Sequence, residues 1–176
     1  MRHVGIALAF FLICSLLVAQ LKYEKSIDWN LPDDAQRVLE KNHTFALYDL
    51  SDSVNPFYLR GDFDGDGKPD YAVLVINKQT KKHGLAVVRS KSRSVDILGA
   101  GGIKLRVGSG QGSYLLDDFD WMNAWHVESR YAIGVQLGRE VESKMSGEGI
   151  VVEKTESASA LILWNGRSYQ WKQMGD

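Results

Sequence analysis

The segment from Gly61 to Asp70 constrains the fold of this chain most strongly, because it places several carboxylates in a short glycine-rich loop directly before an apolar stretch. Counted from the first of them, the acidic residues occupy positions 1, 3, 5 and 9 of the loop. Carboxylates held this closely repel one another unless a cation lies among them. Ca²⁺ takes about six to eight oxygen ligands, and a loop with acidic residues at alternate positions can supply them. The pattern therefore predicts a cation-binding loop, whose acidic residues are Asp62, Asp64, Asp66 and Asp70.

A plain acidic hairpin turn is the alternative interpretation of this loop. Asp-Gly pairs favour turns, and Gly65 and Gly67 reach positive φ at little cost. Turn geometry, however, does not require four carboxylates at alternate positions. An EF-hand is excluded, because its loop ends in a bidentate glutamate at about position 12, where this chain has Val73. The loop is therefore expected to lead into a strand, with Asp70 as its last acidic residue.

Residues 62–70 resemble the D-x-D-G-D-G-x-x-D calcium loop of FG-GAP and VCBS-type repeats, which occurs in integrin-like β-propellers and in small secreted bacterial proteins. The resemblance extends over residues 57–76. It implies a Ca²⁺ ion held by the carboxylates of the four aspartates and by the backbone carbonyl of Lys68. FG-GAP propellers repeat the loop several times, whereas this chain has one good copy, so the resemblance does not extend to a complete set of propeller blades.

The first 19 residues are predicted to be a secretory signal peptide. A basic start at Arg2 precedes an apolar stretch from Val4 to Ala19. One alternative is an uncleaved membrane anchor, although the stretch is slightly shorter than the roughly 20 residues that a membrane helix needs. A lipoprotein signal is another, because Cys14 lies within the stretch. We expect a periplasmic or secreted protein with one domain over residues 20–176, which contacts a membrane only if the leader is retained.

Composition and motifs exclude several classes of function. The formal net charge of −1 gives no field that would attract nucleic acid, and the basic segments at 78–83 and 89–93 are expected to be solvated hairpin ends. Cys14 is the only cysteine, so a processed chain has neither disulfides nor thiolate chemistry. The motifs of the common serine hydrolases, β-lactamases and zinc proteases are absent from the sequence, and its 4 histidines are scattered.

The hydrophobic pattern predicts a mainly β (α+β) fold, an antiparallel sheet, sandwich or partial barrel with one short N-terminal helix. The helix is expected to begin near Pro32, with Asp33 and Gln36 at capping-box spacing, and to end at Asn42. Beyond it the period changes to 2, which is typical of strands. Residues 71–76 are apolar at every position, which predicts a central strand covered on both faces. The predicted strands are 45–50, 57–60, 71–76, 85–89, 94–98, 104–107, 131–137, 150–154, 158–164 and 168–172.

The last two strands are predicted to form a hairpin, because residues 165–166 are Asn-Gly, which favours a two-residue turn. Such a turn would pair Ile162 with Tyr169 and Ala160 with Trp171. The two aromatic residues would then share one face of the hairpin. We expect them to pack in the core, and a platform on which a ligand stacks is the alternative.

A second acidic segment, from Asp117 to Glu128, combines carboxylates with aromatic residues, and three hypotheses remain open for it. Trp121 and Trp125 could anchor a protein or glycan partner, because aromatic residues contribute much of the energy of interfaces. The carboxylates and His126 could form a second metal site or a catalytic pair. The segment could also be an exposed acidic turn whose tryptophans pack into the core.

The sequence as a whole predicts an exported module with a structural Ca²⁺ ion, which acts by binding a protein or glycan partner. A specific alternative is a periplasmic immunity or inhibitor protein directed against a toxin or a wall-degrading enzyme. A third is a calcium-dependent hydrolase that uses residues 117–128. No catalytic residue is predicted.

Overall fold

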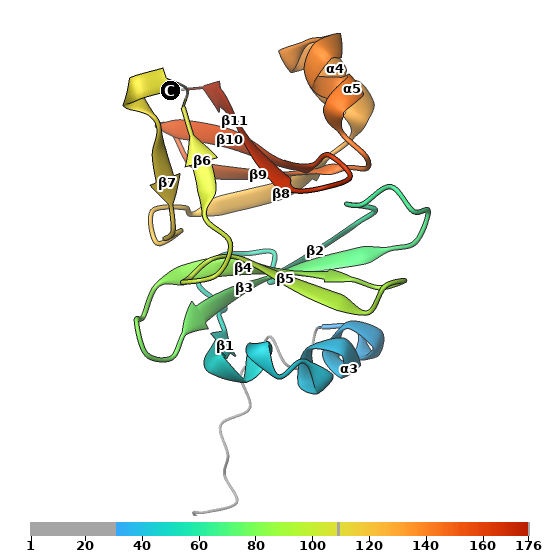
Figure 1. Ribbon diagram of the computed structural model, residues 1–176, viewed down its shortest axis with the longest axis vertical. Coiled ribbons are helices and arrows are strands. Elements are labelled where there is room, and N and C mark those ends of the chain that lie inside the picture. The colour runs from blue at the N-terminus through green and yellow to red at the C-terminus, as the bar shows by residue number, and fades with distance from the viewer. Residues whose placement is uncertain (1–30, 109, 176) are drawn as a thin grey trace, which may run out of the picture.

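The computed structural model describes residues 31–108 and 110–175, which are arranged in four layers (Figure 1). Helix α3 (Asp33–Lys41) covers one face of a five-stranded sheet, and the other face of that sheet packs against a four-stranded sheet. Helices α4 (Arg130–Leu137) and α5 (Arg139–Lys144) cover the far face of the second sheet. The prediction of a mainly β fold with antiparallel sheets is confirmed. The predicted signal peptide lies outside the described residues.

Strand β3 (Asp70–Asn77) is central in the first sheet, since it pairs on one side with β4 (His83–Arg89) and on the other with two short strands. The short 3₁₀ helix η1 (Thr44–Leu47) precedes the short strand β1 (Tyr48–Leu50). The strand predicted from Phe45 therefore begins only at Tyr48. The remaining strands of this sheet are β1 (Tyr48–Leu50), β2 (Tyr58–Gly61) and β5 (Ser94–Gly99).

The second sheet has the strand order β11-β10-β9-β8, and all of its neighbouring strands are antiparallel. A two-stranded ribbon of β6 and β7 follows β5 in the chain, and the 3₁₀ helix η2 (Gly110–Gly112) lies in its turn. The strands of the second sheet and the ribbon are β6 (Leu105–Val107), β7 (Tyr114–Leu116), β8 (Ala124–Glu128), β9 (Gly149–Lys154), β10 (Ala158–Trp164) and β11 (Tyr169–Gly175).

The two central strands are apolar on both faces because each face contacts a different core. In β3, Val73 and Val75 pack towards α3, whereas Ala72 and Leu74 pack between the sheets. This confirms the prediction that residues 71–76 form a strand covered on both sides. Successive side chains of a strand point to opposite faces, so a doubly covered strand must be apolar at every position. Strand β10 behaves in the same way, since Ala160 and Ile162 pack between the sheets and Leu161 and Leu163 pack towards α4.

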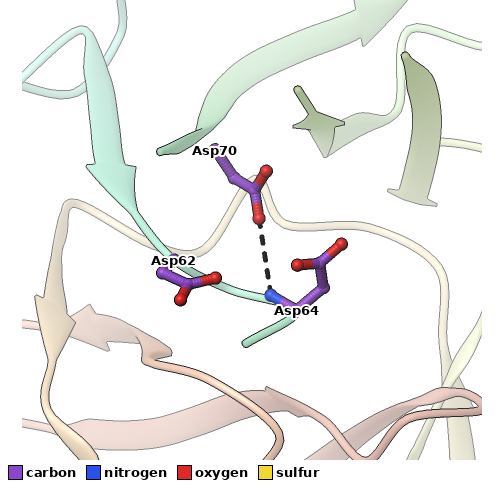
Figure 2. Close-up of side chains that lie close together, drawn as sticks. All are labelled: Asp62, Asp64 and Asp70. Atoms are coloured by element: carbon purple, nitrogen blue, oxygen red, sulfur yellow. Dashed lines mark hydrogen bonds between the residues drawn. The ribbon is translucent and has the colours of Figure 1, made fainter. Parts of the chain in front are cut away.

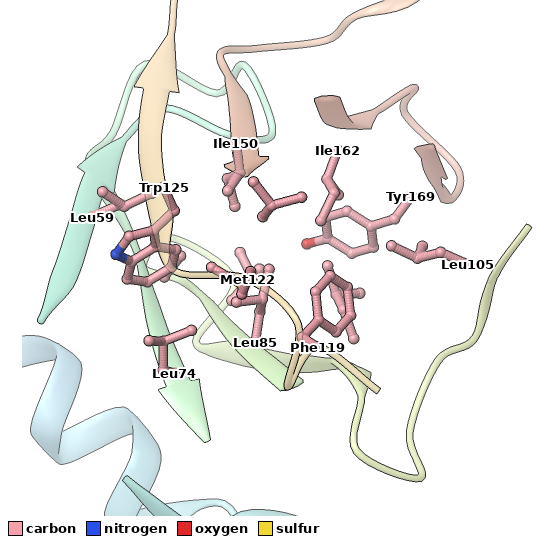
Figure 3. Packing of buried hydrophobic residues seen from close by; sticks show 14 of the residues in the cluster. Leu59, Leu74, Leu85, Leu105, Phe119, Met122, Trp125, Ile150, Ile162 and Tyr169 are labelled. Atoms are coloured by element: carbon pink, nitrogen blue, oxygen red, sulfur yellow. The ribbon is translucent and has the colours of Figure 1, made fainter. Parts of the chain in front are cut away.

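The core between the two sheets is the largest of the three (Figure 3). It includes the aromatic side chains of Phe119, from the chain that links the two sheets, and of Trp125, from β8. The smaller core on the far face of the second sheet is formed by Ile133 of α4 with Met145 and residues of β9 and β10. Among the described helices, none is both long and apolar enough to cross a membrane.

The prediction of a strand at 131–137 is wrong, because residues 130–137 form helix α4. Ser129 caps this helix by accepting a hydrogen bond from the backbone N–H of Ala132 at 3.2 Å. Of the alternating apolar residues that suggested a strand, Ile133 is buried, while Tyr131 and Val135 are 73% and 70% exposed. Two of the four alternating apolar residues face solvent, so their spacing does not mark the buried face of a strand.

The C-terminal hairpin exists, but its register differs from the prediction. Trp164 pairs with Tyr169 and Ile162 pairs with Trp171, so the turn contains four residues instead of two. The side chain of Asn165 accepts hydrogen bonds from the N–H groups of Arg167 and Ser168 at 3.0 and 2.9 Å, which stabilises the longer turn. A shift of two residues leaves every side chain on its predicted face, and both aromatic residues contact the core as expected.

Two further local expectations are corrected. Asp33 does not cap α3, because the N-cap residue is Pro32 and no side chain makes a capping hydrogen bond there. The amide of Gln36 instead donates to the carbonyl of Leu31 at 2.7 Å. The strands β7 and β8 were not predicted. β8 lies within the acidic segment 117–128 and, among the described strands, pairs with β9 alone.

Candidate metal centre

The loop between β2 and β3 brings together three of the four predicted carboxylates (Figure 2). One oxygen atom each of Asp62, Asp64 and Asp70 lies within 4.8 Å of the other two. The loop turns back on itself at Gly65 and Gly67, whose φ angles of 77° and 80° favour glycine. The sequence therefore folds locally in the way that a cation site requires, with side chains from both ends of the loop on one spot.

Asp70 is the innermost member of the group and is fully buried. Its Oδ2 accepts hydrogen bonds from the N–H groups of Phe63 and Asp64 at 3.1 and 3.4 Å, and its Oδ1 accepts one from Ser90 at 2.9 Å. Burial first, and then the nearby charge of Asp64, raise the pKa of the Asp70 carboxyl to about 6, although the hydrogen bonds oppose this rise. A positive charge beside this carboxylate would therefore stabilise its ionised form.

Asp62 holds the loop backbone in its turned shape. Its Oδ1 accepts hydrogen bonds from Gly65 and Asp66 at 2.9 and 3.0 Å, and its Oδ2 accepts one from Gly67 at 2.9 Å. Each carboxylate oxygen has two lone pairs, so these bonds leave capacity for a further ligand. Asp62 can thus shape the loop and face a cation at the same time.

Asp64 is half-buried, and its charge is disfavoured where it lies. Burial, and then the neighbouring charges of Asp66 and Asp62, raise the pKa of the Asp64 carboxyl, although its hydrogen bond from the Asp66 N–H opposes this. The structure gives Asp64 no lysine or arginine partner within 4.0 Å among the described residues. Like charges held together in this way are the electrostatic condition that a bound dication relieves.

The fourth aspartate and the predicted carbonyl ligand are placed differently. The Asp66 carboxylate is not within the group of three, since it accepts the N–H of Lys68 at 2.8 Å and lies 3.9 Å from Nζ of Lys91. Lys68 is exposed at the tip of the loop. The roles that the resemblance implies for these two residues remain predictions.

Residues from another part of the chain, which were not predicted, hold the loop in place. The segment between α5 and β9 crosses the loop so closely that a Cβ added at Gly147 would collide with the carbonyl oxygen of Asp62. A Cβ at Gly65 would likewise collide with the backbone of Ser146. Glu148 contributes both a backbone and a side-chain hydrogen bond to Asp62. The glycines at 147 and 149 were visible in the sequence, but nothing in their local pattern indicated which segment they approach.

The donor set fits a hard dication. Carboxylate oxygens are the ligands that Ca²⁺, Mg²⁺ and Mn²⁺ prefer, whereas zinc and copper favour histidine and cysteine. The three grouped side chains are all aspartates, and one of them is buried with a raised pKa. Three carboxylates alone do not complete the coordination of Ca²⁺, which takes about six to eight oxygens, so the remainder must come from the backbone, Asp66 or water.

The second acidic segment does not gather its carboxylates into a site. Asp117 accepts hydrogen bonds from Lys82 and from the N–H of Gly101, and Asp118 accepts one from the N–H of His83 at 2.9 Å. Burial raises the pKa of Asp117, but the bonds from Lys82 and Gly101 and the nearby lysine charges outweigh it and hold the pKa below its usual value. These aspartates fasten the connecting chain to the first sheet.

The other residues of this segment also have structural surroundings. Trp125 is 3% exposed, and its indole N–H donates to the carbonyl of Pro56 at 2.7 Å, so it belongs to the core. Trp121 is half-buried and packs beside Phe119 and Trp171. His126 lies on β8 with its Nδ1 3.5 Å from a carboxylate oxygen of Glu153, which lies outside the segment, and its Nε2 is 4.0 Å from Glu128.

Comparison with known proteins adds no identification: a scan against protein-family models, a search of curated proteins and a search of solved structures each found no match to the chain.

Proposed function

We propose that this chain is an exported module in which residues 62–70 bind a structural Ca²⁺ ion, and that the domain acts by binding a protein or glycan partner. The observation that carries the proposal is the grouping of Asp62, Asp64 and Asp70, with one oxygen of each inside 4.8 Å. The resemblance of the loop to FG-GAP and VCBS-type calcium loops supports Ca²⁺ as the ion. Weak sites suffice outside cells, where dissociation constants up to about 10⁻³ M are typical of extracellular modules.

The position of the loop supports a structural role for the ion. The loop joins β2 to the central strand β3, and it is also bonded to the segment that leads into β9 of the other sheet. An ion that neutralises its carboxylates would therefore strengthen contacts in both sheets. A bound ligand that does not bind the unfolded chain stabilises the fold in proportion to the logarithm of its concentration over its dissociation constant.

The test of the ion is calorimetric titration with CaCl₂ and MgCl₂, combined with thermal unfolding in CaCl₂ and in EGTA. We expect saturable binding of Ca²⁺ and a higher melting temperature in CaCl₂ than in EGTA. The double variant Asp64→Asn/Asp66→Asn should lose both effects. The variant Asp120→Asn, which changes an exposed aspartate outside the loop, is the control and should retain them. Equal melting temperatures with and without chelator in the unmodified protein would refute the role of the ion.

The partner is proposed to bind near Trp121, because Trp125 is buried. The neighbouring ribbon of β6 and β7 adds exposed apolar side chains, with Tyr114 57% and Leu115 53% exposed. Aromatic residues that are partly exposed next to apolar ones are typical of binding surfaces. Affinity capture from an envelope extract should recover a partner that is lost with Trp121→Ala and retained with Tyr131→Ser, which alters an exposed residue on α4.

The immunity or inhibitor hypothesis is a specific form of this proposal. It predicts that the captured partner is a toxin or a wall-degrading enzyme whose activity falls when the chain is added. Capture of a partner with no such activity would refute the inhibitor hypothesis but remain consistent with a binding module.

A further inference from the structure

A cleft between helix α3 and the turn that joins β4 to β5 has chemistry that the cation loop does not account for. Its volume is about 360 Å³. The lining comes from two segments distant in the sequence, the exposed side of α3 and residues 90–93. The lining residues are Asp34, Arg37, Val38, Lys41, Asn42, Ser90 and Arg93.

Within residues 31–108 and 110–175, no side chain pairs with the three cations of this cleft. None of Arg37, Lys41 and Arg93 makes an ion pair or a hydrogen bond with any residue that the structure describes. The one carboxylate of the cleft, Asp34, is approached by the hydroxyl of Tyr71 at 3.4 Å and by the N–H of Ala35 at 3.0 Å. The chain carries a formal net charge of −1, so this local excess of positive charge is a property of the cleft and not of the whole molecule.

Two nearby cations, Arg89 at the end of β4 and Lys91 in the turn, have partners in the fold. Arg89 lies 3.0 Å from the Asp96 carboxylate and stacks over the ring of Trp164, and Lys91 lies 3.9 Å from Asp66. These side chains have partners inside the fold. Arg93, at the end of the same turn, has none among the described residues and lines the cleft instead. Arg93 of this turn thus lies on the side of the cleft that faces α3.

Helix α3 presents Arg37 and Lys41 four residues apart on one face, a spacing at which like charges repel each other. Lys41 in the last turn suits the helix dipole, but that effect needs no second cation beside it. The buried face of α3, with Ala35 and Leu39, already accounts for how the helix packs. Neither Arg37 nor Lys41 takes part in that packing, and both line the cleft opposite Arg93.

We propose that this cleft binds the phosphate group of a soluble phosphate ester. A phosphate dianion offers several acceptor oxygens, and arginine side chains recognise it with paired N–H donors. Two arginines, a lysine, and the polar side chains of Ser90 and Asn42 supply more donors than a single carboxylate can use. The volume exceeds that of a phosphate group alone, and Val38 gives it an apolar wall, so the remainder of the cleft suits a small organic group such as a sugar.

The cleft adjoins the cation loop, since the N–H of Ser90 donates to Asp70 at 2.9 Å, but none of its lining residues belongs to residues 62–70. Its test therefore uses a ligand other than the ion. The experiment is an NMR titration of the ¹⁵N-labelled chain with sodium phosphate, glucose 6-phosphate and glucose, at constant ionic strength and at a calcium level too low for precipitation. We expect saturable shifts confined to the amides of residues 34–42 and 90–94. Glucose 6-phosphate should bind more tightly than phosphate, and glucose should cause no shift.

Matched double variants decide the assignment. Arg37→Gln/Arg93→Gln should weaken binding of glucose 6-phosphate at least tenfold. Lys154→Gln/Arg167→Gln removes the same charge from exposed positions outside the cleft and should leave the affinity unchanged. Equal weakening in both variants, or shifts that do not saturate, would overturn the proposal. Binding to phosphatidic acid vesicles without binding to glucose 6-phosphate would overturn it as well.

Discussion

Asp62 and Glu148 are hydrogen-bonded to each other in both directions. The backbone N–H of Asp62 donates to the carboxylate of Glu148 at 2.8 Å, and the backbone N–H of Glu148 donates to the carbonyl oxygen of Asp62 at 2.7 Å. The two residues are 86 positions apart in the chain. This pair fastens the acidic loop, which belongs to the first sheet, to the segment that leads into β9 of the second sheet.

The close crossing at this point depends on Gly147. We expect Gly147→Ala to destabilise the protein, because the added Cβ would meet the backbone of Asp62 and Gly65, which cannot move without displacing the loop. Overpacking of this kind costs about 1–3 kcal/mol, which corresponds to a fall of about 2–12 °C in melting temperature for a chain of this size. Thermal unfolding followed by circular dichroism measures it.

Gly112→Ala is the matched control for that substitution. A Cβ at Gly112 meets no atom within 4 Å, and the residue does not have a positive φ. Its melting temperature should stay within about 2 °C of the unmodified protein, since surface substitutions usually change stability by less than 0.5 kcal/mol. If the two alanine variants melt together, the loop and the segment at 147 do not pack as described.

Glu148 is expected to act on cation binding through Asp62. In Glu148→Ala the N–H of Asp62 loses its acceptor, which costs about 1–3 kcal/mol for a group shielded from water, and the first aspartate of the loop loses its support. Both the stability in EGTA and the affinity for Ca²⁺ should fall. Glu148→Gln keeps an acceptor oxygen and should restore most of both. If the glutamine variant is as impaired as the alanine variant, the charge of Glu148 matters instead of its hydrogen bond.

The features that sequence predicts well here are those set by residues close together in the chain. The local sequence is enough to predict the structure of residues 71–76 and 62–70. The apolar run forms a buried strand, and the spaced acidic residues form a turned loop. The bounds of the strand Ala158–Trp164 agree with the prediction, because a short apolar run is bounded by polar and turn residues on both sides.

The features that could not be predicted depend on contacts between distant segments. Helix α4 formed where an alternating pattern suggested a strand, because Ser129 caps it and only part of its apolar set needs burial. The position of Gly147 over Asp62 follows from how the two sheets pack, which no local pattern contains. The cleft beside α3 likewise joins Arg37 to Arg93, and each looks like an ordinary solvated cation in the sequence.

Asp64→Asn is expected to have opposite effects with and without the ion. In EGTA the substitution removes a charge that burial and the neighbouring Asp66 and Asp62 disfavour, so the melting temperature should stay equal or rise. In CaCl₂ the variant should melt below the unmodified protein, because a ligand is lost. Thermal unfolding of both proteins, once in EGTA and once in CaCl₂, tests these opposite effects. A variant that is less stable in both conditions would show that Asp64 supports the apo loop instead of an ion.

The last prediction concerns Tyr169, whose hydroxyl donates to the Asp96 carboxylate at 3.1 Å and so joins the two sheets. Tyr169→Phe should cost about 1.5–3 kcal/mol, as is typical for a hydrogen bond to a charged group, while Tyr131→Phe, at a position 73% exposed, should cost almost nothing. Burial first, and then the charge of Asp96, raise the pKa of Tyr169 above its usual value. The unfolded phenol ionises near pH 10, so the stabilisation is complete below about pH 10 and is lost as the pH rises further. Unfolding in urea at pH 8 and at pH 11 should therefore show a smaller loss of stability in Tyr169→Phe than in the unmodified protein, and an equal loss in both would contradict the assignment.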